Sequence, residues 1–275
     1  MDFLNDPLAL ATGVGVAIAL HVLGVKVLAE KTGQSKLALW AAFVTEAIAG
    51  LILGVALFQA VRWLTGLSGG GAVLGAIGSI IALTLGWQAV KMLVAMIRDL
   101  ADGQPDKEAR RAALWVPTLI PAGWAAVTGL VSNPRGIGGG IVAAIQAAIT
   151  LAYTLSIVKE TIKAKKHQVP WRWFAAAVCT LAGLVLIAAV IYIDGLLADY
   201  LSAGVMVAVR LIGGAVGLGF AIAALADISD GVPGAHVRKF AVYGLPLLYL
   251  FGSAIIAWAS KNASSGLDLI SGNMS

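Results

Sequence analysis

Charged residues are scarce in this sequence. Asp, Glu, Lys and Arg make up 12% of its 275 residues, whereas a typical water-soluble domain is about one quarter charged. Hydrophobic residues make up 60% of the chain, and the mean hydropathy is +0.92. So few polar side chains cannot cover that much apolar surface in water. The composition therefore excludes an ordinary soluble domain and indicates a protein that folds within a lipid bilayer.

Cysteine and histidine are nearly absent. The one cysteine, Cys179, lies inside an apolar run, which excludes an intrachain disulfide framework and a cysteine-rich metal site. The three histidines are scattered along the chain, and no HExxH or GxSxG motif occurs. We therefore predict no catalytic residue, no metal and no cofactor. An enzyme acting on lipid-linked substrates ranks last among three functional hypotheses.

Long apolar runs fill most of the chain. A helix needs about 20 mainly apolar residues to cross a bilayer, and its backbone must satisfy its own hydrogen bonds there. We therefore predict an all-α, polytopic transmembrane helical bundle that forms one integral-membrane domain over 1–275. Its eight expected spans cover about 7–29, 37–61, 72–97, 113–131, 138–160, 172–193, 200–226 and 240–259.

Lysine and arginine gather on one side of these spans. Fifteen of them lie in or beside the odd-numbered connections, and only three lie on the opposite side. The positive-inside rule then places the basic side in the cytoplasm, with both termini outside the cytoplasmic (inner) membrane.

One basic loop stands out, and it contains Lys163, Lys165, Lys166 and Arg172. We interpret it as a topology signal beside interfacial tryptophans. Contact with anionic lipid head groups is an alternative, and there is no direct evidence for nucleic acid. The mixed-charge segments 90–111 and 159–172 are candidate docking sites for a cytoplasmic partner. Besides the lipid bilayer, the expected partners are other membrane subunits or further copies of this chain.

Four of the spans open in the same way, with basic residues, an aromatic residue and an apolar run that closes on glycine. The aromatic residues are Trp40, Trp115, Trp173 and Phe240. This spacing is consistent with four tandem helical hairpins. The alternative is that the pattern only reflects what any inner membrane boundary looks like.

Glycines recur four residues apart within the spans. Small residues at this spacing let helix backbones approach closely, which supplies packing energy between helices in lipid. The pattern predicts a tight bundle and an oligomer. The helix-packing candidates are Gly50, Gly54, Gly71, Gly75, Gly213 and Gly217.

Two opposite charges lie near the middle of the predicted membrane. Glu46 is about 13 Å and Arg210 about 15 Å from the nearer end of its span, counting about 1.5 Å per residue. An ionisable residue at this depth marks a functional site by default. We predict that Glu46 and Arg210 face the interior and pair, either as a structural clamp or as a proton or ion site. The secondary polar candidates are His21, Gln88, Lys91 and Gln146.

Two functional hypotheses rank above that of an enzyme. The first is a structural or pore-lining subunit of a larger membrane complex of the secretion, conjugation or energy-transducing type. The glycine-rich faces and the charged helical ledges favour it. The second is a stand-alone small secondary transporter or channel in which Glu46 binds a proton or ion. The intramembrane charges and the prolines of the fourth span favour it.

Overall fold

The computed structural model consists of helices, and 93% of it is helical with no strand in the described part. The chain forms two compact units, Met1–Ser132 and Asn133–Ser275. The structure describes residues 7–29, 35–65, 71–132, 136–165, 168–229, 231–252 and 255.

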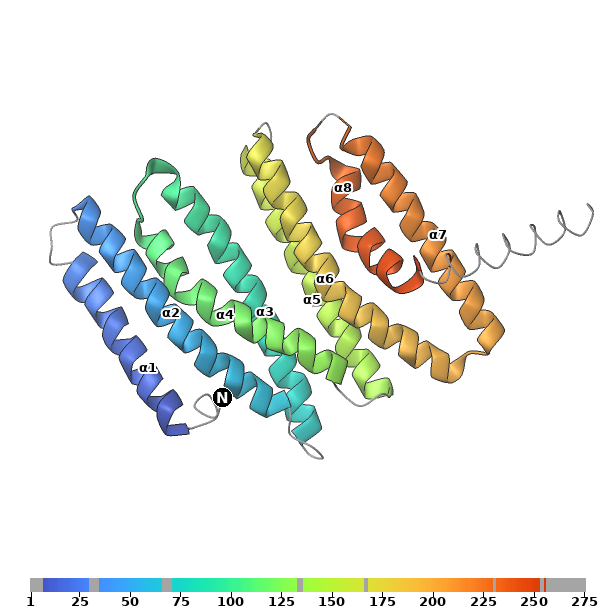
Figure 1. The fold of residues 1–275 in the computed structure, drawn as a ribbon, viewed down its shortest axis with the longest axis horizontal. Coiled ribbons are helices and arrows are strands. Elements are labelled where there is room, and N and C mark those ends of the chain that lie inside the picture. The colour runs from blue at the N-terminus through green and yellow to red at the C-terminus, as the bar shows by residue number, and fades with distance from the viewer. Residues whose placement is uncertain are drawn as a thin grey trace, which may run out of the picture. The chain divides into compact units, whose positions relative to one another are not determined.

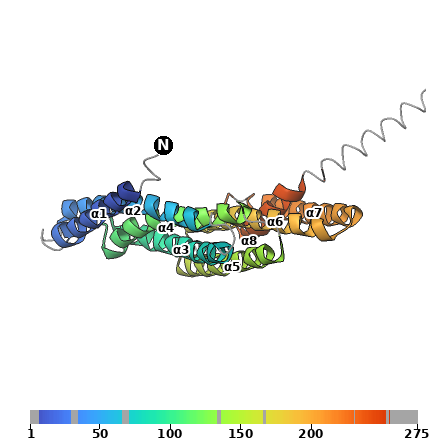
Figure 2. The ribbon, with the colours of Figure 1, turned by 90° about the horizontal axis from the view of Figure 1, so that it is seen from below.

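The first unit contains four long helical segments (Figure 1). Helix α1 (Pro7–Val22) continues into a π-helical segment, η2 (Leu23–Ala29), and α2 is Lys36–Thr65. Helix α3 (Gly71–Asp99) is followed by a short 3₁₀ turn, η3 (Leu100–Asp102), and α4 is Lys107–Ser132. Helix α4 packs against both α2 and α3, whereas α1 packs chiefly on α2. Figure 2 shows α3 below α4 in this unit.

The second unit also consists of consecutive helical hairpins. Helices α5 (Ile137–Lys165) and α6 (Val169–Tyr200) pack on each other, and α7 is Ala203–Asp227. The last hairpin arm begins with α8 (Ala235–Lys239), passes through a π-helical segment, η4 (Phe240–Gly244), and is helical again over 245–252. This arm lies against both α6 and α7, which have few contacts with each other.

Prolines and glycines together create the seam between α2 and α4. Pro117 and Pro121 lie inside α4 without ending it, and each lacks the N–H that would bond the carbonyl four residues earlier. Those carbonyls belong to Ala113 and Pro117. A Cβ atom added to Gly50 would lie 2.9 Å from the Ala113 oxygen, and one added to Gly54 would collide with the Pro117 oxygen. The exposed carbonyls of α4 therefore lie against the bare Cα atoms of α2.

Six helices of the described chain are long and apolar enough to cross a membrane. Eight spans are therefore not confirmed. The predicted span 113–131 corresponds to α4, whose apolar run is interrupted by Pro117, Thr118 and Pro121. The predicted span 240–259 extends beyond the described residues. The six candidates are Leu8–Leu28, Lys36–Val61, Gly75–Asp99, Gly138–Ile162, Val169–Tyr200 and Ala203–Asp227.

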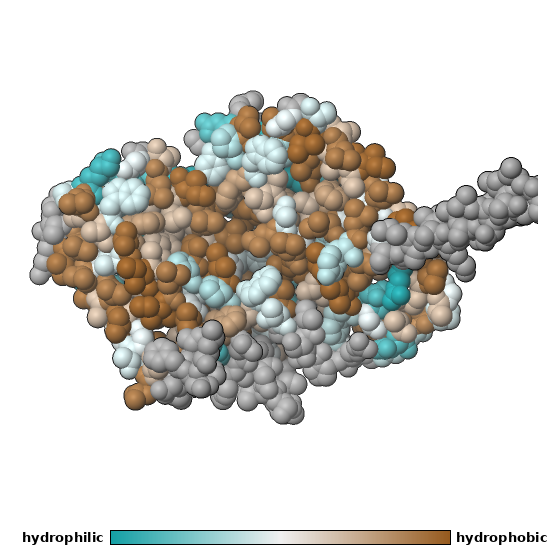
Figure 3. Space-filling model, in the orientation of Figure 1, coloured by the Kyte–Doolittle hydropathy of each residue, from teal (hydrophilic) through white to brown (hydrophobic). Residues whose placement is uncertain are grey.

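Hydrophobic side chains dominate the visible surface of both units, as the brown areas of Figure 3 show. Large apolar residues that would be buried in a soluble protein are exposed here, for example Leu8 (75%), Ile212 (65%) and Leu225 (71%). Exposed apolar helix surfaces on this scale require a nonpolar environment. The long apolar helices thus indicate an integral membrane protein.

Candidate functional site

A histidine and a glutamate meet inside the first unit. The Nδ1 atom of His21, at the end of α1, lies 2.8 Å from Oε2 and 3.0 Å from Oε1 of Glu46 on α2. Both distances are within hydrogen-bonding range, so one proton is held between the imidazole nitrogen and the carboxylate. The two side chains come from different helices, so their hydrogen bond also joins α1 to α2.

The two side chains differ sharply in exposure. The side chain of Glu46 is 2% exposed, whereas that of His21 is 45% exposed. The carboxylate is therefore enclosed, and the imidazole stands between it and the surface of the unit. Large apolar neighbours flank His21 on that surface, with Ile18 55% and Val22 49% exposed. The pair thus connects a buried acid to an otherwise apolar helix face.

The helix changes its winding two residues after His21. The π-helical segment η2 begins at Leu23 and continues to Ala29. Gly24 lies in this segment. A Cβ atom added to it would lie 3.1 Å from Thr45 Oγ1 and 3.2 Å from Glu46 Oε1. Glycine at this position leaves room for the glutamate side chain beside the wider turn.

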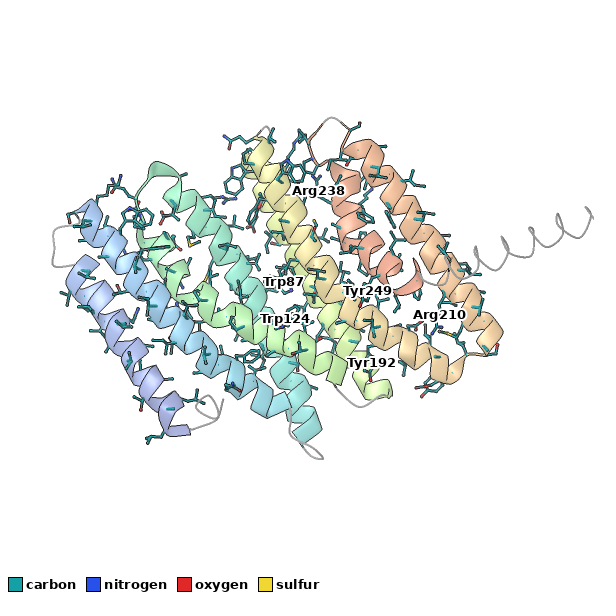
Figure 4. All side chains as sticks on the ribbon, viewed as in Figure 1. Trp87, Trp124, Tyr192, Arg210, Arg238 and Tyr249 are labelled. Carbon is teal, nitrogen blue, oxygen red and sulfur yellow. The ribbon has the colours of Figure 1, made fainter. Side chains whose placement is uncertain are left out.

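The predicted pairing of Glu46 with Arg210 is corrected by these contacts. Arg210 instead binds Asp194 with two hydrogen bonds, Nε to Oδ1 at 3.1 Å and Nη2 to Oδ2 at 2.9 Å. Asp194 lies on α6 and Arg210 on α7, so the ion pair joins the two arms of one hairpin. Figure 4 places Arg210 near the end of α7 that adjoins α6. The side chain of Arg210 is 40% exposed, not enclosed as predicted.

The sequence contains a signal for both observed pairs. In an antiparallel hairpin, residues at equal distances from the turn face each other. His21 and Glu46 lie at nearly equal distances from the connection between η2 and α2, and Asp194 and Arg210 from Ser202. Depth in the membrane alone did not identify these partners, because depth does not specify which helices are neighbours.

The other predicted polar residues lie apart from this pair. Gln88 and Lys91 are half-buried on α3, and each has an interaction of its own. Gln146 is 2% exposed on α5, and its Nε2 has no hydrogen-bond partner among the described residues. Thr150, one turn further along, is fully buried and its hydroxyl is likewise unpaired there. Sequence reasoning missed Thr150 because threonine is common in membrane helices.

Several of the predicted packing glycines lie at close helix contacts. A Cβ atom on Gly50 or Gly54 would strike α4 backbone, and one on Gly213 or Gly217 would meet Phe251 or Leu248. Gly75 is buried on α3, and the surroundings of Gly71 are outside the described side chains. Gly86, which was not predicted, also lies at a close contact between α3 and α4, where its added Cβ would lie 2.9 Å from the Cα of Gly123.

The side chains of Lys163, Lys165 and Lys166 in the predicted basic loop lie outside the described part of the structure, whereas Arg172 is half-buried near the start of α6. Within the described ranges, no group of three or more His, Cys, Asp or Glu side chains could hold a metal ion.

Comparison of the chain with protein-family models, with curated proteins and with solved structures found no match.

Proposed function

We propose that this protein is a pore-lining integral-membrane subunit of a larger complex, and that its His21–Glu46 pair binds and releases protons. One observation carries the proposal. A 45% exposed imidazole lies in an apolar helix face and is hydrogen-bonded to an enclosed carboxylate. Such an arrangement suits a site that exchanges protons between a buried acid and whatever covers that face.

The nature of the basic partner supports proton binding over a permanent clamp. A guanidinium stays protonated at all physiological pH values, so an arginine would hold a glutamate ionised. Glu46 is instead paired with the imidazole of His21, whose ring nitrogens can donate or accept a hydrogen bond. This pairing supports proton exchange over a permanent ion pair.

The exposed part of the His21 side chain supports the proposal that another protein covers it. Polar groups within a membrane core face a protein interior or a water-filled space, because lipid chains offer no hydrogen bonds. Within the first unit, α1 packs chiefly on α2, and the outer edge of the imidazole remains uncovered. Another subunit, or a water-filled path between subunits, would satisfy that edge.

The second candidate function is a stand-alone transporter or channel that uses the same pair. The observation that favours it is that both members of the pair come from one unit of one chain.

Site-specific photocrosslinking in the native host separates the two candidates. A photoreactive residue replaces Val22 beside His21 in a tagged chain, and a matched control carries it at Ile222, an exposed apolar position on α7. We expect crosslinking of Val22 to a defined second protein. If both positions capture only lipid, and the chain purifies alone in mild detergent, the subunit proposal is wrong.

Proton binding is tested after reconstitution into liposomes, with or without the captured partner. We expect Glu46→Gln to abolish proton flux driven by a membrane potential. Glu160→Gln is the matched control, because Glu160 is an exposed glutamate near the end of α5. Flux through Glu46→Gln equal to that of the wild type would exclude a role of the pair in proton transfer.

A further inference from the structure

The connection between α3 and α4 and the connection between α7 and α8 have the same residues at the same spacing. The first reads DLADGQPDKEARR (99–111) and the second DISDGVPGAHVRK (227–239). Five positions are identical and lie 128 residues apart (227 minus 99). The identical residues are Asp99 and Asp227, Asp102 and Asp230, Gly103 and Gly231, Pro105 and Pro233, and Arg110 and Arg238.

The aspartate that ends each long helix caps the next helix in both units. Oδ2 of Asp99 accepts a hydrogen bond from the backbone N–H of Ala109 at 2.7 Å. Oδ2 of Asp227 accepts hydrogen bonds from the N–H groups of His236 at 2.8 Å and Val237 at 3.1 Å. A carboxylate that binds free N–H groups at a helix start stabilises that helix.

The glycine and the arginine also have the same task in both units. Gly103 and Gly231 adopt the left-handed conformation, with φ of 81° and 77°, which glycine adopts without steric cost. Nη1 of Arg110 donates to the carbonyl of Pro105 at 2.9 Å, and Nη1 of Arg238 lies 3.5 Å from that of Pro233. Both prolines are fully buried. We call each of the two segments, 99–111 and 227–239, a capping hook.

The correspondence extends along the helices that the capping hook connects. Helices α3 and α7 end, and α4 and α8 begin, at positions 128 residues apart. At the same offset, Gly86 approaches Gly123 in the first unit and Gly214 approaches Phe251 in the second, with added Cβ atoms 2.9 Å and 3.0 Å from the neighbouring backbone.

The contact of the preceding helix corresponds as well. An added Cβ on Gly50 of α2 would meet the carbonyls of Ala113 and Leu114, and one on Gly183 of α6 would meet the carbonyl of Ala241. Ala113 and Ala241 are again 128 residues apart. Aligning α2 with α6 on these two glycines places Cys179 at the position of Glu46.

We infer that the chain is a tandem duplication of one four-helix unit, and that only the first copy has the acid of the proton site. The repeat therefore spans two hairpins, not the single hairpin that the aromatic spacing suggested. Four of the five matching residue pairs have a structural task that the structure describes, whereas exposed positions differ, such as Lys107 against Ala235 and Glu108 against His236. The two copies thus share a scaffold. They differ in exposed residues and in the residue at the position of Glu46.

An exchange of the two hooks within the full-length chain tests this inference. Residues 99–111 are replaced by the sequence of 227–239, with Ala109 retained because that position is fully buried. The reciprocal variant places the sequence of 99–111 at 227–239 but keeps Val237 and Gly234, because a Cβ atom added to Gly234 would collide with the capping carboxylate of Asp227. A matched control has the same grafted residues in shuffled order, so that the five shared residues are displaced.

We expect both grafts to retain at least half of the wild-type yield in the membrane and a single symmetric elution peak, and the shuffled control to lose both. Loss of folding in both grafts, as in the shuffled control, would overturn the inference, because equivalent parts must be interchangeable. Tolerance of the shuffled sequence would also overturn it, because the shared residues would then have no scaffold role.

Discussion

At the scale of single residues, the unequal burial of His21 and Glu46 decides how the pair responds to substitution. Glu46 is enclosed and depends on the imidazole for a charged or hydrogen-bonding partner, whereas His21 has a second, exposed side. Removing the histidine therefore strands a buried carboxylate. Changing the glutamate to its amide leaves a side chain of the same shape that still forms a hydrogen bond with the imidazole.

We expect His21→Ala to lower the free energy of unfolding by about 1–3 kcal/mol, the typical cost of leaving a buried polar group without its partner. Glu46→Gln should cost less. Thermal unfolding in detergent micelles measures both, with His236→Ala as a control at an exposed histidine. A loss for His21→Ala no greater than that for His236→Ala would contradict the assigned contact.

The reassignment of Arg210 to Asp194 is tested by double-mutant cycles. We expect the cycle of Arg210→Met with Asp194→Asn to give a clear coupling energy, in the range of about 0.5–3 kcal/mol found for residues in contact. The cycle of Arg210→Met with Glu46→Gln should give none beyond about 0.5 kcal/mol. Strong coupling in the second cycle would restore the pairing that the sequence suggested.

At the scale of secondary-structure elements, backbone contact holds α2 on α4. Because of its prolines, α4 has two carbonyls without their usual backbone hydrogen bond. Gly50 and Gly54 of α2 lie directly against these carbonyls. Thr118 strengthens the seam, because its hydroxyl donates to the carbonyl of Gly50 at 3.1 Å and to that of Leu114 at 2.7 Å. The prolines of α4 thus promote its packing against α2.

We expect Gly50→Ala to lower the free energy of unfolding by about 1–3 kcal/mol or more, because its Cβ would overlap the carbonyls of α4. Gly15→Ala is the matched control. Nothing lies within 4 Å of an added Cβ there, and alanine favours a helix over glycine by up to about 1 kcal/mol. Thermal unfolding and size-exclusion chromatography compare the two variants. Equal stability would show that α2 and α4 are not in backbone contact.

The helices and their glycine contacts were accessible from the sequence, because apolar length and small residues four apart are local patterns. The charge partners were accessible only through their equal distances from the hairpin turns, because depth within a span does not reveal which helix lies alongside. The capping hook was missed for a different reason. Its five shared residues are spread over 13 positions, and their equivalence becomes evident only once Asp99 and Asp227 are seen to cap the following helix.

At the scale of the whole molecule, each unit contributes an even number of helical arms in the described chain. On the predicted topology, a unit with an even number of spans begins and ends on the same side of the membrane. The positive-inside rule predicts a cytoplasmic connection around Arg110 and another around Arg238. A duplicated unit of this kind keeps its predicted orientation without any change in loop charge.

Helix α6 has a further consequence for the membrane around the protein. Its 32 residues rise about 48 Å, whereas the hydrocarbon layer of a bilayer is about 30 Å thick. The part before Asp194 is already about 37 Å long, with Trp171 and Trp173 at its beginning. Such a helix must tilt or thicken its surroundings. Lipids with longer acyl chains should therefore relieve this hydrophobic mismatch, and short-chain lipids should increase it.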